Sequence, residues 1–225
     1  GASLDEPADV VVDANGDVYV ADAGANRIRR IDPSGDITTV AGTGQAGYGG
    51  DNGPAINARL NSPVGIAIDA GGSLYIADEG NNRVRKIDSG GTITTVAGTG
   101  AAGFSGDGGA ATAAELDHPS GVAVDGAGDL YIADTYNNRV REVNTGGIIT
   151  TVAGTGSASG PDSGSFGGDG GPAVGAYLNN PGGVALDDAN DLFIADTLNN
   201  RLRKVDVNGV LTTVAGAGGF PHYDG

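Results

Sequence analysis

Short runs in which apolar side chains alternate with small or polar ones recur along the whole chain and predict β-strands. At 63–69, for example, Ile66 and Ile68 alternate with Gly65 and Ala67, which is the period of two of a strand. Further runs of this kind follow at 73–78, 83–88 and 92–97, separated by turns rich in Gly, Asn and Asp. The segment from 60 to 100 therefore predicts four antiparallel strands joined by short turns.

This four-strand pattern is written four times, with copies that open at Leu4, Leu60, Leu116 and Leu178. A repeat of this length, made of short strands and Gly turns, is typical of a β-propeller in which each copy is one blade. The predicted fold class is all-β, a propeller of four-stranded antiparallel blades with four blades in the chain. We expect one domain over 4–225, with blades at about 4–59, 60–115, 116–177 and 178–225. The first blade has expected strands near Val10–Val12, Val18–Ala21, Ile28–Ile31 and Ile37–Val40.

The first and last strands of a copy differ in the residues they carry. The first strand has one face of very small residues, which are Gly65/Ala67, Gly121/Ala123 and Gly183/Ala185 in the last three copies. Such a face fits the crowded place where the strands of neighbouring blades converge at a propeller axis, although ordinary tight sheet packing also accounts for it. The fourth strand instead carries Thr94 and Thr95, which are β-branched and half-polar and suit the outer edge of a sheet.

Three motifs mark each copy. The element Pro-x-Gly-[Ile/Val]-Ala-[Ile/Val/Leu]-Asp occurs at Pro63–Asp69, Pro119–Asp125 and Pro181–Asp187, and the first copy departs from it at Asp9 and Val11. The elements Tyr-[Ile/Val]-Ala-Asp and Asn-Asn-Arg follow, with Phe193 in place of Tyr in the last copy and Ala25-Asn26-Arg27 in the first. These motifs resemble those of the NHL-repeat family, and the resemblance covers essentially the whole chain. It implies a β-propeller, and the long Gly-rich connecting loops are similar to those of bacterial members, which favours a secreted or cell-surface bacterial protein.

Composition and charge exclude several classes of partner and site. The formal net charge is −16, and so acidic a surface repels phosphate backbones, so we expect no nucleic-acid partner. The chain has no cysteine, which removes disulfides, cysteine zinc sites and thiol catalysis. No apolar run approaches the ~20 residues of a membrane span, so we expect no membrane partner. No signal peptide is evident, although residues 1–3 are compatible with the scar of a removed one.

One face of the propeller is the better candidate for binding. Alternate connections of an antiparallel blade lie on opposite faces, so the long segments 42–59, 98–115 and 154–177 share a face with the Asp-x-x-Asn-Arg turns. Long loops gathered on one rim are typical of a binding face. The candidate ligand contacts are its aromatic residues, although such a ring can instead turn inward and anchor its own loop. They are Tyr48, Phe104, Tyr136 and Phe166.

Two sets of repeated carboxylates have competing interpretations. Each long loop holds a Gly-Asp-x-Gly element, with Asp51, Asp107 and Asp169, and we expect these to cap the short helical turn that follows at Pro54–Ala58 or Pro172–Ala176. Calcium is the less favoured interpretation, because each loop supplies only one carboxylate. An Asp and an Arg five residues apart across a turn also recur, and we predict that they form a structural clasp through charge-assisted hydrogen bonds. The pairs are Asp22/Arg27, Asp78/Arg83, Asp134/Arg139 and Asp196/Arg201.

A catalytic role has little support in the sequence. The only histidines are His118 and His222, none recurs on the inner strand, and neither a Gly-x-Ser-x-Gly element nor a P-loop is present. We therefore expect no catalytic residue, no metal and no cofactor, and favour a binding or scaffolding module for a protein, peptide or glycan ligand. A propeller lyase or lactonase with a metal in its channel, and a propeller fragment or designed protein with no separable activity, remain as alternatives.

Four copies are fewer than the six blades that are common among NHL propellers. The first and last copies are as apolar as the inner ones, so neither end has a polar cap. We expect a homodimer that completes an eight-bladed ring; the alternatives are a closed monomer of four blades and a piece of a longer propeller.

Overall fold

A computed structural model describes residues 3–156 and 167–218 of the chain. The predicted fold class is confirmed: the structure is all-β, a propeller with four antiparallel sheets, each containing one complete blade. The strands of blade 1 are β1 (Pro7–Val12), β2 (Val18–Asp22), β3 (Arg27–Ile31) and β4 (Ile37–Ala41). These four match the strands expected from the period-two alternation. Among the described residues, no helix is long and apolar enough to cross a membrane.

The other three blades repeat this order. Blade 2 consists of β6 (Pro63–Ile68), β7 (Leu74–Asp78), β8 (Arg83–Ile87) and β9 (Thr92–Ala97). Blade 3 consists of β10 (Pro119–Val124), β11 (Leu130–Asp134), β12 (Arg139–Val143) and β13 (Ile149–Ala153). Blade 4 consists of β15 (Pro181–Leu186), β16 (Leu192–Asp196), β17 (Arg201–Val205) and β18 (Val210–Ala215). After the second strand, each of blades 2 to 4 has one 3-10 turn: η2 (Glu79–Asn81), η4 (Thr135–Asn137) and η6 (Thr197–Asn199).

The long loops add a short strand to the blade that follows them. The two-residue strand β5 (Gly53–Pro54) pairs with β9, and β14 (Gly171–Pro172) pairs with β18. A 3-10 turn comes next in each long loop, at η1 (Ala55–Asn57), η3 (Ala111–Ala113) and η5 (Ala173–Gly175). The threonines of the fourth strand had predicted that it forms the outer edge of the sheet. In blades 2 and 4 this edge is partly covered, because the two-residue strand of the preceding loop pairs with it. Each loop straps one blade to the next.

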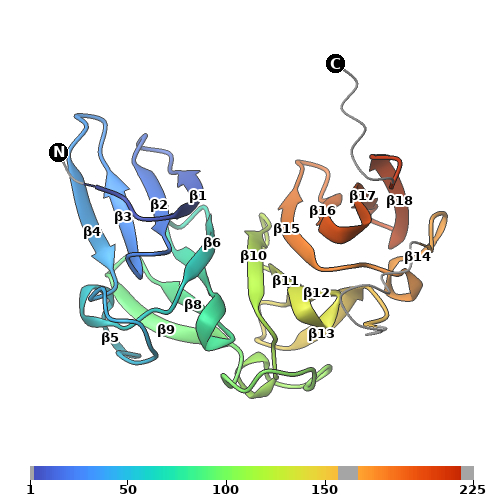
Figure 1. The fold of residues 1–225 in the computed structure, drawn as a ribbon, viewed down its shortest axis with the longest axis horizontal. Coiled ribbons are helices and arrows are strands. Elements are labelled where there is room, and N and C mark those ends of the chain that lie inside the picture. Colours follow the sequence, from blue (N-terminus) through green and yellow to red (C-terminus); the bar gives the residue numbers. More distant parts are fainter. Residues whose placement is uncertain (1–2, 157–166, 219–225) are drawn as a thin grey trace.

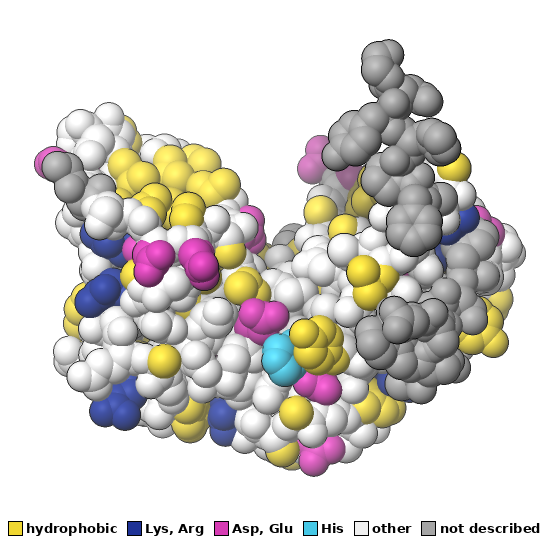
Figure 2. Space-filling view, viewed as in Figure 1, with side chains coloured by type: hydrophobic (Ala, Val, Ile, Leu, Met, Phe, Trp, Pro, Cys, Tyr) yellow, Lys and Arg dark blue, Asp and Glu magenta, His cyan; other side chains and the backbone are white. Residues whose placement is uncertain are grey.

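The blades stand around one axis, with β1, β6, β10 and β15 toward the middle and β4, β9, β13 and β18 at the periphery (Figure 1). Consecutive inner strands pack on each other from β1 to β15. Blades 1 and 4 are separated by an open gap, which the space-filling view also shows (Figure 2). The four blades therefore form an arc with two end faces.

The hydrophobic core lies between the blades, in three clusters, one at each junction. At the first junction, Ala21 and Ile28 of blade 1 pack against Leu60 and Ile76 of blade 2, and all four are fully buried. The same positions meet at the second junction, where Val84 packs with Leu116 and Ile132. Because each blade is a single sheet, burial of its two faces depends on its neighbours.

The small residues of the inner strands lie where neighbouring backbones meet, as predicted. A Cβ added to Gly65 would lie 2.2 Å from the carbonyl oxygen of Ser120 in the next blade. A Cβ on Gly121 would lie 2.7 Å from the Cα of Gly183. The same addition at Gly183 meets only the Cβ of Ala195, at 3.9 Å, because this strand borders the gap. In blades 2 and 3 the Gly therefore leaves room for the backbone of the next blade, whereas blade 1 has Asp9 at this position, bonded to the Ile66 amide of blade 2.

Candidate binding face

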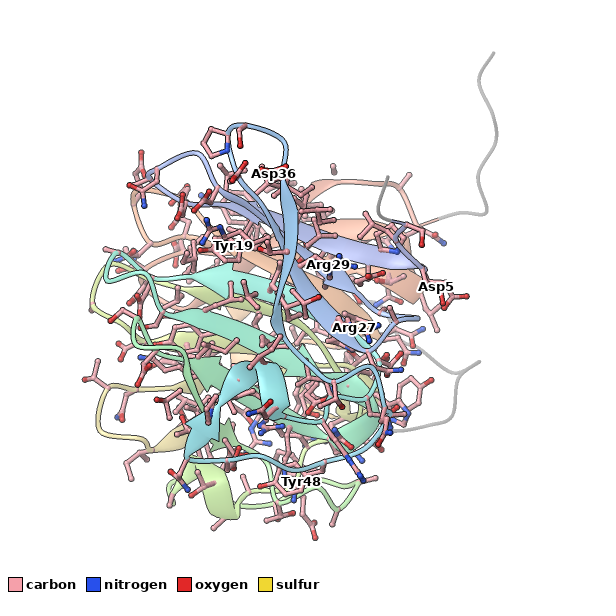
Figure 3. The ribbon with its side chains drawn as sticks, turned by 90° about the vertical axis from the view of Figure 1, so that its left-hand side faces the viewer. Asp5, Tyr19, Arg27, Arg29, Asp36 and Tyr48 are labelled. Atoms are coloured by element: carbon pink, nitrogen blue, oxygen red, sulfur yellow. The ribbon has the colours of Figure 1, made fainter. Side chains whose placement is uncertain are left out.

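The long loops and the Asn-Arg turns lie on the same face of the propeller, as the sequence predicted. The side-chain amide of Asn81, at the end of η2, donates to the Gly47 carbonyl of the first long loop at 2.9 Å. Asn137 makes the same bond to Gly103 of the second loop at 2.7 Å. In Figure 3, Asp5 and Arg27 mark this side of blade 1, whereas Asp36 lies in a short turn away from them. We refer to the side that carries the long loops as the long-loop face.

A fully buried arginine organises each of blades 2 to 4. In blade 2, the guanidinium of Arg85 donates to Asp78 at 3.2 Å and to Asp51 of the long loop. It also donates to the carbonyls of Gly49 and Arg59 at 3.3 and 3.4 Å. One cation therefore bridges the strand β7 and the loop that arrives from blade 1. The equivalent ion pairs are Arg141 with Asp134 and Asp107, and Arg203 with Asp196 and Asp169.

The predicted clasp pairs each aspartate with the wrong arginine. Asp22, Asp78, Asp134 and Asp196 form their ion pairs with Arg29, Arg85, Arg141 and Arg203, two residues beyond Arg27, Arg83, Arg139 and Arg201. Both arginines of a strand project from the same face of the sheet, since they are two residues apart. The first one stands at the strand end, opposite the aspartate, and its long side chain runs outward to loop carbonyls: Arg139 donates to Thr155 at 2.7 Å and to Asn137 at 3.2 Å.

The buried aspartate of blade 3 accepts hydrogen bonds from three different residues. In blade 3, Asp134 accepts from the backbone amide of Asp117 at 2.8 Å, from Asn137 at 2.8 Å and from Arg141 at 3.3 Å. Burial raises the pKa of Asp134 to about 6, against the opposing effect of these three donors. Burial also raises the pKa of Asp78, against the equivalent donors in blade 2.

The loop aspartates do not cap the 3-10 turns, contrary to our expectation. The N-cap position before η1 is Pro54, and no side chain caps that turn. Asp51 instead accepts from the Thr95 hydroxyl at 2.7 Å and from Tyr48 at 2.9 Å, in addition to Arg85. Burial opposes the ionisation of Asp51, but these hydrogen bonds and the Arg85 charge together hold its pKa below its usual value. Asp78 accepts from one terminal nitrogen of the Arg85 guanidinium and Asp51 accepts from the other, so the inward carboxylate satisfies donors that Asp78 does not reach.

Two of the predicted ligand contacts lie flat against the arginines. The guanidinium of Arg83 stands 3.7 Å from the ring centre of Tyr48, and Arg139 stands 3.6 Å from that of Phe104. These rings anchor their own loops through cation–π contacts. Each ring also keeps one side in solvent, because Tyr48 is 44% and Phe104 39% exposed. The position of Tyr48 within the first long loop is visible in Figure 3. Phe166 lies outside the described residues.

The fourth predicted contact belongs to a cluster that sequence reasoning missed. Tyr136 is 52% exposed and stacks on His118, with ring centres 4.2 Å apart. The Nδ1 atom of His118 lies 2.8 Å from a carboxylate oxygen of Asp117. Burial raises the pKa of Glu79 in the neighbouring blade, against the opposing effect of the nearby His118. Figure 2 shows a histidine beside a large hydrophobic side chain and between acidic ones on this face. The one signal of this cluster in the sequence is His118 itself, a histidine at a position where the other copies have Glu6, Ser62 and Asn180.

The axis offers few groups for chemistry. A cavity of about 330 Å³ is lined by residues of all four inner strands, among them Ala8, Asp9, Ser120 and Gly182. Asp9 is the one ionisable side chain among the described lining residues, and its carboxylate already accepts from the amides of Val10 and Ile66 at 2.8 and 2.9 Å. No group of three or more carboxylates or histidines within the described residues has the arrangement of a metal site.

Comparison with known proteins agrees with this architecture. The chain is 30% identical over 216 residues to Protein SUPPRESSOR OF QUENCHING 1, chloroplastic, of Arabidopsis thaliana, covering 91% of this chain and 20% of that protein. It is 31% identical over 227 residues to human Teneurin-1, covering 92% of this chain and 8% of the relative. The chain thus spans only a minor part of both relatives. Among solved structures, a streptogramin B lyase matches with a TM-score of 0.59 at 16% identity, over 95% of this chain and 55% of the lyase.

Models of two related families match the chain. The Teneurin NHL domain model matches residues 44–104, 101–160 and 151–222. The NHL repeat model matches residues 4–31. Together with the four clasped blades, these matches establish that the chain belongs to the NHL-repeat family of β-propellers.

Proposed function

We propose that this chain is a non-catalytic binding or scaffolding module that presents the long-loop face of blades 2 and 3 to a protein, peptide or glycan ligand. The observation that carries the proposal is the double use of the loop aromatics. Tyr48 and Phe104 are fixed from below by arginines, yet keep one side exposed. A rigid aromatic surface loses little conformational entropy when a ligand binds.

Two of the exposed rings, Phe104 and Tyr136, lie on segments that are bonded to each other. Asn137 bonds to Gly103, so Tyr136 and Phe104 lie on adjoining segments of blade 3. Tyr136 in turn stacks on His118, whose backbone amide donates to Asn82 of blade 2 at 2.9 Å. The proposed contacts are therefore continuous from blade 2 to blade 3. Tyrosine and other aromatic residues are enriched among residues that dominate binding energy.

The charges around these rings favour a ligand that carries basic groups. Glu79 and Asp117 flank His118, and the chain as a whole has a net charge of −16. Such a field attracts cationic side chains and repels phosphate groups. We therefore propose basic peptides or neutral glycans ahead of nucleic acid.

A lyase-like reaction at the axis is less well supported. The likeness to the streptogramin B lyase concerns the fold alone. Within the described part of the axial cavity, Asp9 is the one ionisable group, and the backbone amides of two strands already occupy its carboxylate. A general acid–base reaction needs a group that can reach the substrate proton, and Asp9 is held away from that role.

The test begins with an array of glycans and a library of basic peptides, and continues by titration calorimetry with the best binder. We expect Tyr136→Ala to weaken binding by about tenfold or more, the effect of losing a dominant aromatic contact. The matched control is Val207→Ala, because Val207 is 68% exposed but lies in a short turn on the opposite side. A binder that is lost with Val207→Ala and unaffected by Tyr136→Ala contradicts the proposed face.

A further inference from the structure

The two end faces of the arc carry the separate halves of a contact that every interior blade junction makes. At each junction, the asparagine directly before the first arginine of one blade's third strand accepts a hydrogen bond from a backbone amide at the start of the next blade. The pairs are Asn26 with Ser62 at 2.9 Å, Asn82 with His118 at 2.9 Å, and Asn138 with Asn180 at 2.7 Å. This bond fixes the register between neighbouring blades.

At the open ends the same two groups are present but have no partner blade. Asn200 of blade 4 is the counterpart of Asn138, and both have the same left-handed backbone, with φ of 51° and 52°. Glu6 of blade 1 is the counterpart of Ser62, again with matching φ of 49° and 51°. Within the described residues, neither the Asn200 side chain nor the Glu6 amide forms a hydrogen bond. The backbone is therefore already shaped for a contact that is not made.

The apolar surfaces of the two end faces complement each other in the same way. Val10 of blade 1 is 58% exposed, whereas its counterpart in blade 2, Ile66, is 4% exposed. Leu202 of blade 4 is 37% exposed, whereas its counterpart Val84 is fully buried against blade 3. Figure 2 shows a hydrophobic patch on blade 1 at the rim of the gap. The face of blade 4 thus has the chemistry that covers the face of blade 1.

We propose that the end faces dock with a second copy of this chain, head to tail, so that two copies close an eight-bladed ring. Blade 4 of each copy packs on blade 1 of the other, and Asn200 accepts from the Glu6 amide across both junctions. An interface between unlike faces closes into a ring when its rotation allows. These faces are separate from the long-loop face, so the two proposals stand or fall independently.

The first measurement is the mass of the 225-residue chain by light scattering over a range of concentrations. One chain has a mass of 21.9 kDa, and we expect a measured mass of about twice this value. A single-chain mass at every concentration overturns the proposal. A mass that grows without limit as the concentration rises overturns the closed ring, because an unclosed head-to-tail contact forms filaments.

Point variants then locate the interface. We call the end face of blade 1 the head and that of blade 4 the tail. Val10→Asp places a charge on the head, and we expect it to reduce the association constant by at least about 100-fold across two junctions. Asn200→Ala removes one acceptor from each junction, with an expected loss of about tenfold. Gly183→Ala fills the space that the incoming backbone needs and also weakens association. The control is Val207→Asp, an exposed apolar residue away from both end faces. A dimer unaffected by the first three variants overturns the proposal.

A mixing experiment separates a head-to-tail contact from other dimers. Val10→Asp damages only the head and Leu202→Asp only the tail, so each variant alone has two damaged junctions. In an equal mixture, the undamaged head of the second variant meets the undamaged tail of the first. We therefore expect mixed dimers to form where neither variant alone associates. A Leu202→Asp variant that dimerises as well as the parent chain indicates a head-to-head contact and overturns the proposal.

Discussion

Blades 1 and 2 contain the same four strands, yet they hold the same arginine in very different ways. Arg85 of blade 2 is fully buried and meets two carboxylates and two carbonyls. Arg29 of blade 1 keeps 14% of its side chain exposed and meets Asp22 alone, at 3.5 Å, within the described residues. Blade 2 therefore has a closed polar network, whereas blade 1 has one loose ion pair.

Two differences in sequence account for this contrast. Blade 1 has Ala25 where blade 2 has Asn81, so Asp22 lacks the amide donor that Asp78 receives at 2.8 Å. Among the described residues, Arg29 also has no second carboxylate in the place that Asp51 takes beside Arg85. The clasp is therefore not a property of one blade. It is a junction that forms when a loop from one blade reaches the arginine of the next.

The largest expected effect on stability comes from replacing the clasp arginine, which we compare in two single variants, one in each blade. Arg85→Met leaves Asp78 buried without its counter-ion and frees Asp51, so we expect the free energy of unfolding to fall by about 3–5 kcal/mol. Arg29→Met disrupts a weaker and partly solvated pair, with an expected loss of about 1 kcal/mol. Urea denaturation followed by circular dichroism measures both. If the two variants lose the same free energy of unfolding, the buried network of blade 2 is no stronger than the single ion pair of blade 1.

The pH dependence of stability offers a second test of the buried network. The pKa of Asp134 is about 6 in the folded state, above its ordinary value, so the folded chain holds more protons than the unfolded chain between about pH 4 and 6. The contribution of this group to stability is therefore present at low pH and is lost as the pH rises through 6. We expect it to change by about 3 kcal/mol over this window.

Asp134→Asn isolates that contribution, because the variant cannot titrate. Stability measured at several pH values is expected to change less steeply in the variant between pH 4 and 6. Titration of the Asp134 carboxyl carbon by NMR gives its pKa directly. A midpoint below 4 contradicts the dominance of burial over the hydrogen bonds from Asp117, Asn137 and Arg141.

The junctions also predict different costs for one substitution along the inner strands. Gly65→Ala forces a Cβ against the Ser120 carbonyl, and we expect a loss of about 2 kcal/mol. Gly183→Ala meets only open space and Ala195, so the folding of a single chain is expected to change by less than about 0.5 kcal/mol. Thermal unfolding at low protein concentration compares the two. A large loss for Gly183→Ala at that concentration shows that blade 4 is already covered.

Most of the fold could be predicted from the sequence, whereas the connections of the clasp could not. The strands follow from local alternation, and their order follows from the repeat. The choice between Arg83 and Arg85 as the partner of Asp78 depends on where each side chain ends in space, which a spacing of five or seven residues does not reveal. The partnership of Asp51 with Arg85 spans 34 residues. Its one sequence signal is that the same separation recurs for Asp107 with Arg141 and for Asp169 with Arg203.

The smallest expected effect concerns the ring that lies on the clasp. Tyr48→Leu removes both the contact with Arg83 and the hydrogen bond to Asp51, with an expected loss of about 1 kcal/mol. Tyr48→Phe keeps the ring and loses only the hydroxyl, so it should cost about half as much. Because the ring anchors its loop, trypsin should cut after the exposed Arg59 faster in the leucine variant than in the phenylalanine variant. If both variants are cut at the parent rate, the clasp alone holds the loop, and the exposed side of the ring is left to contact a ligand.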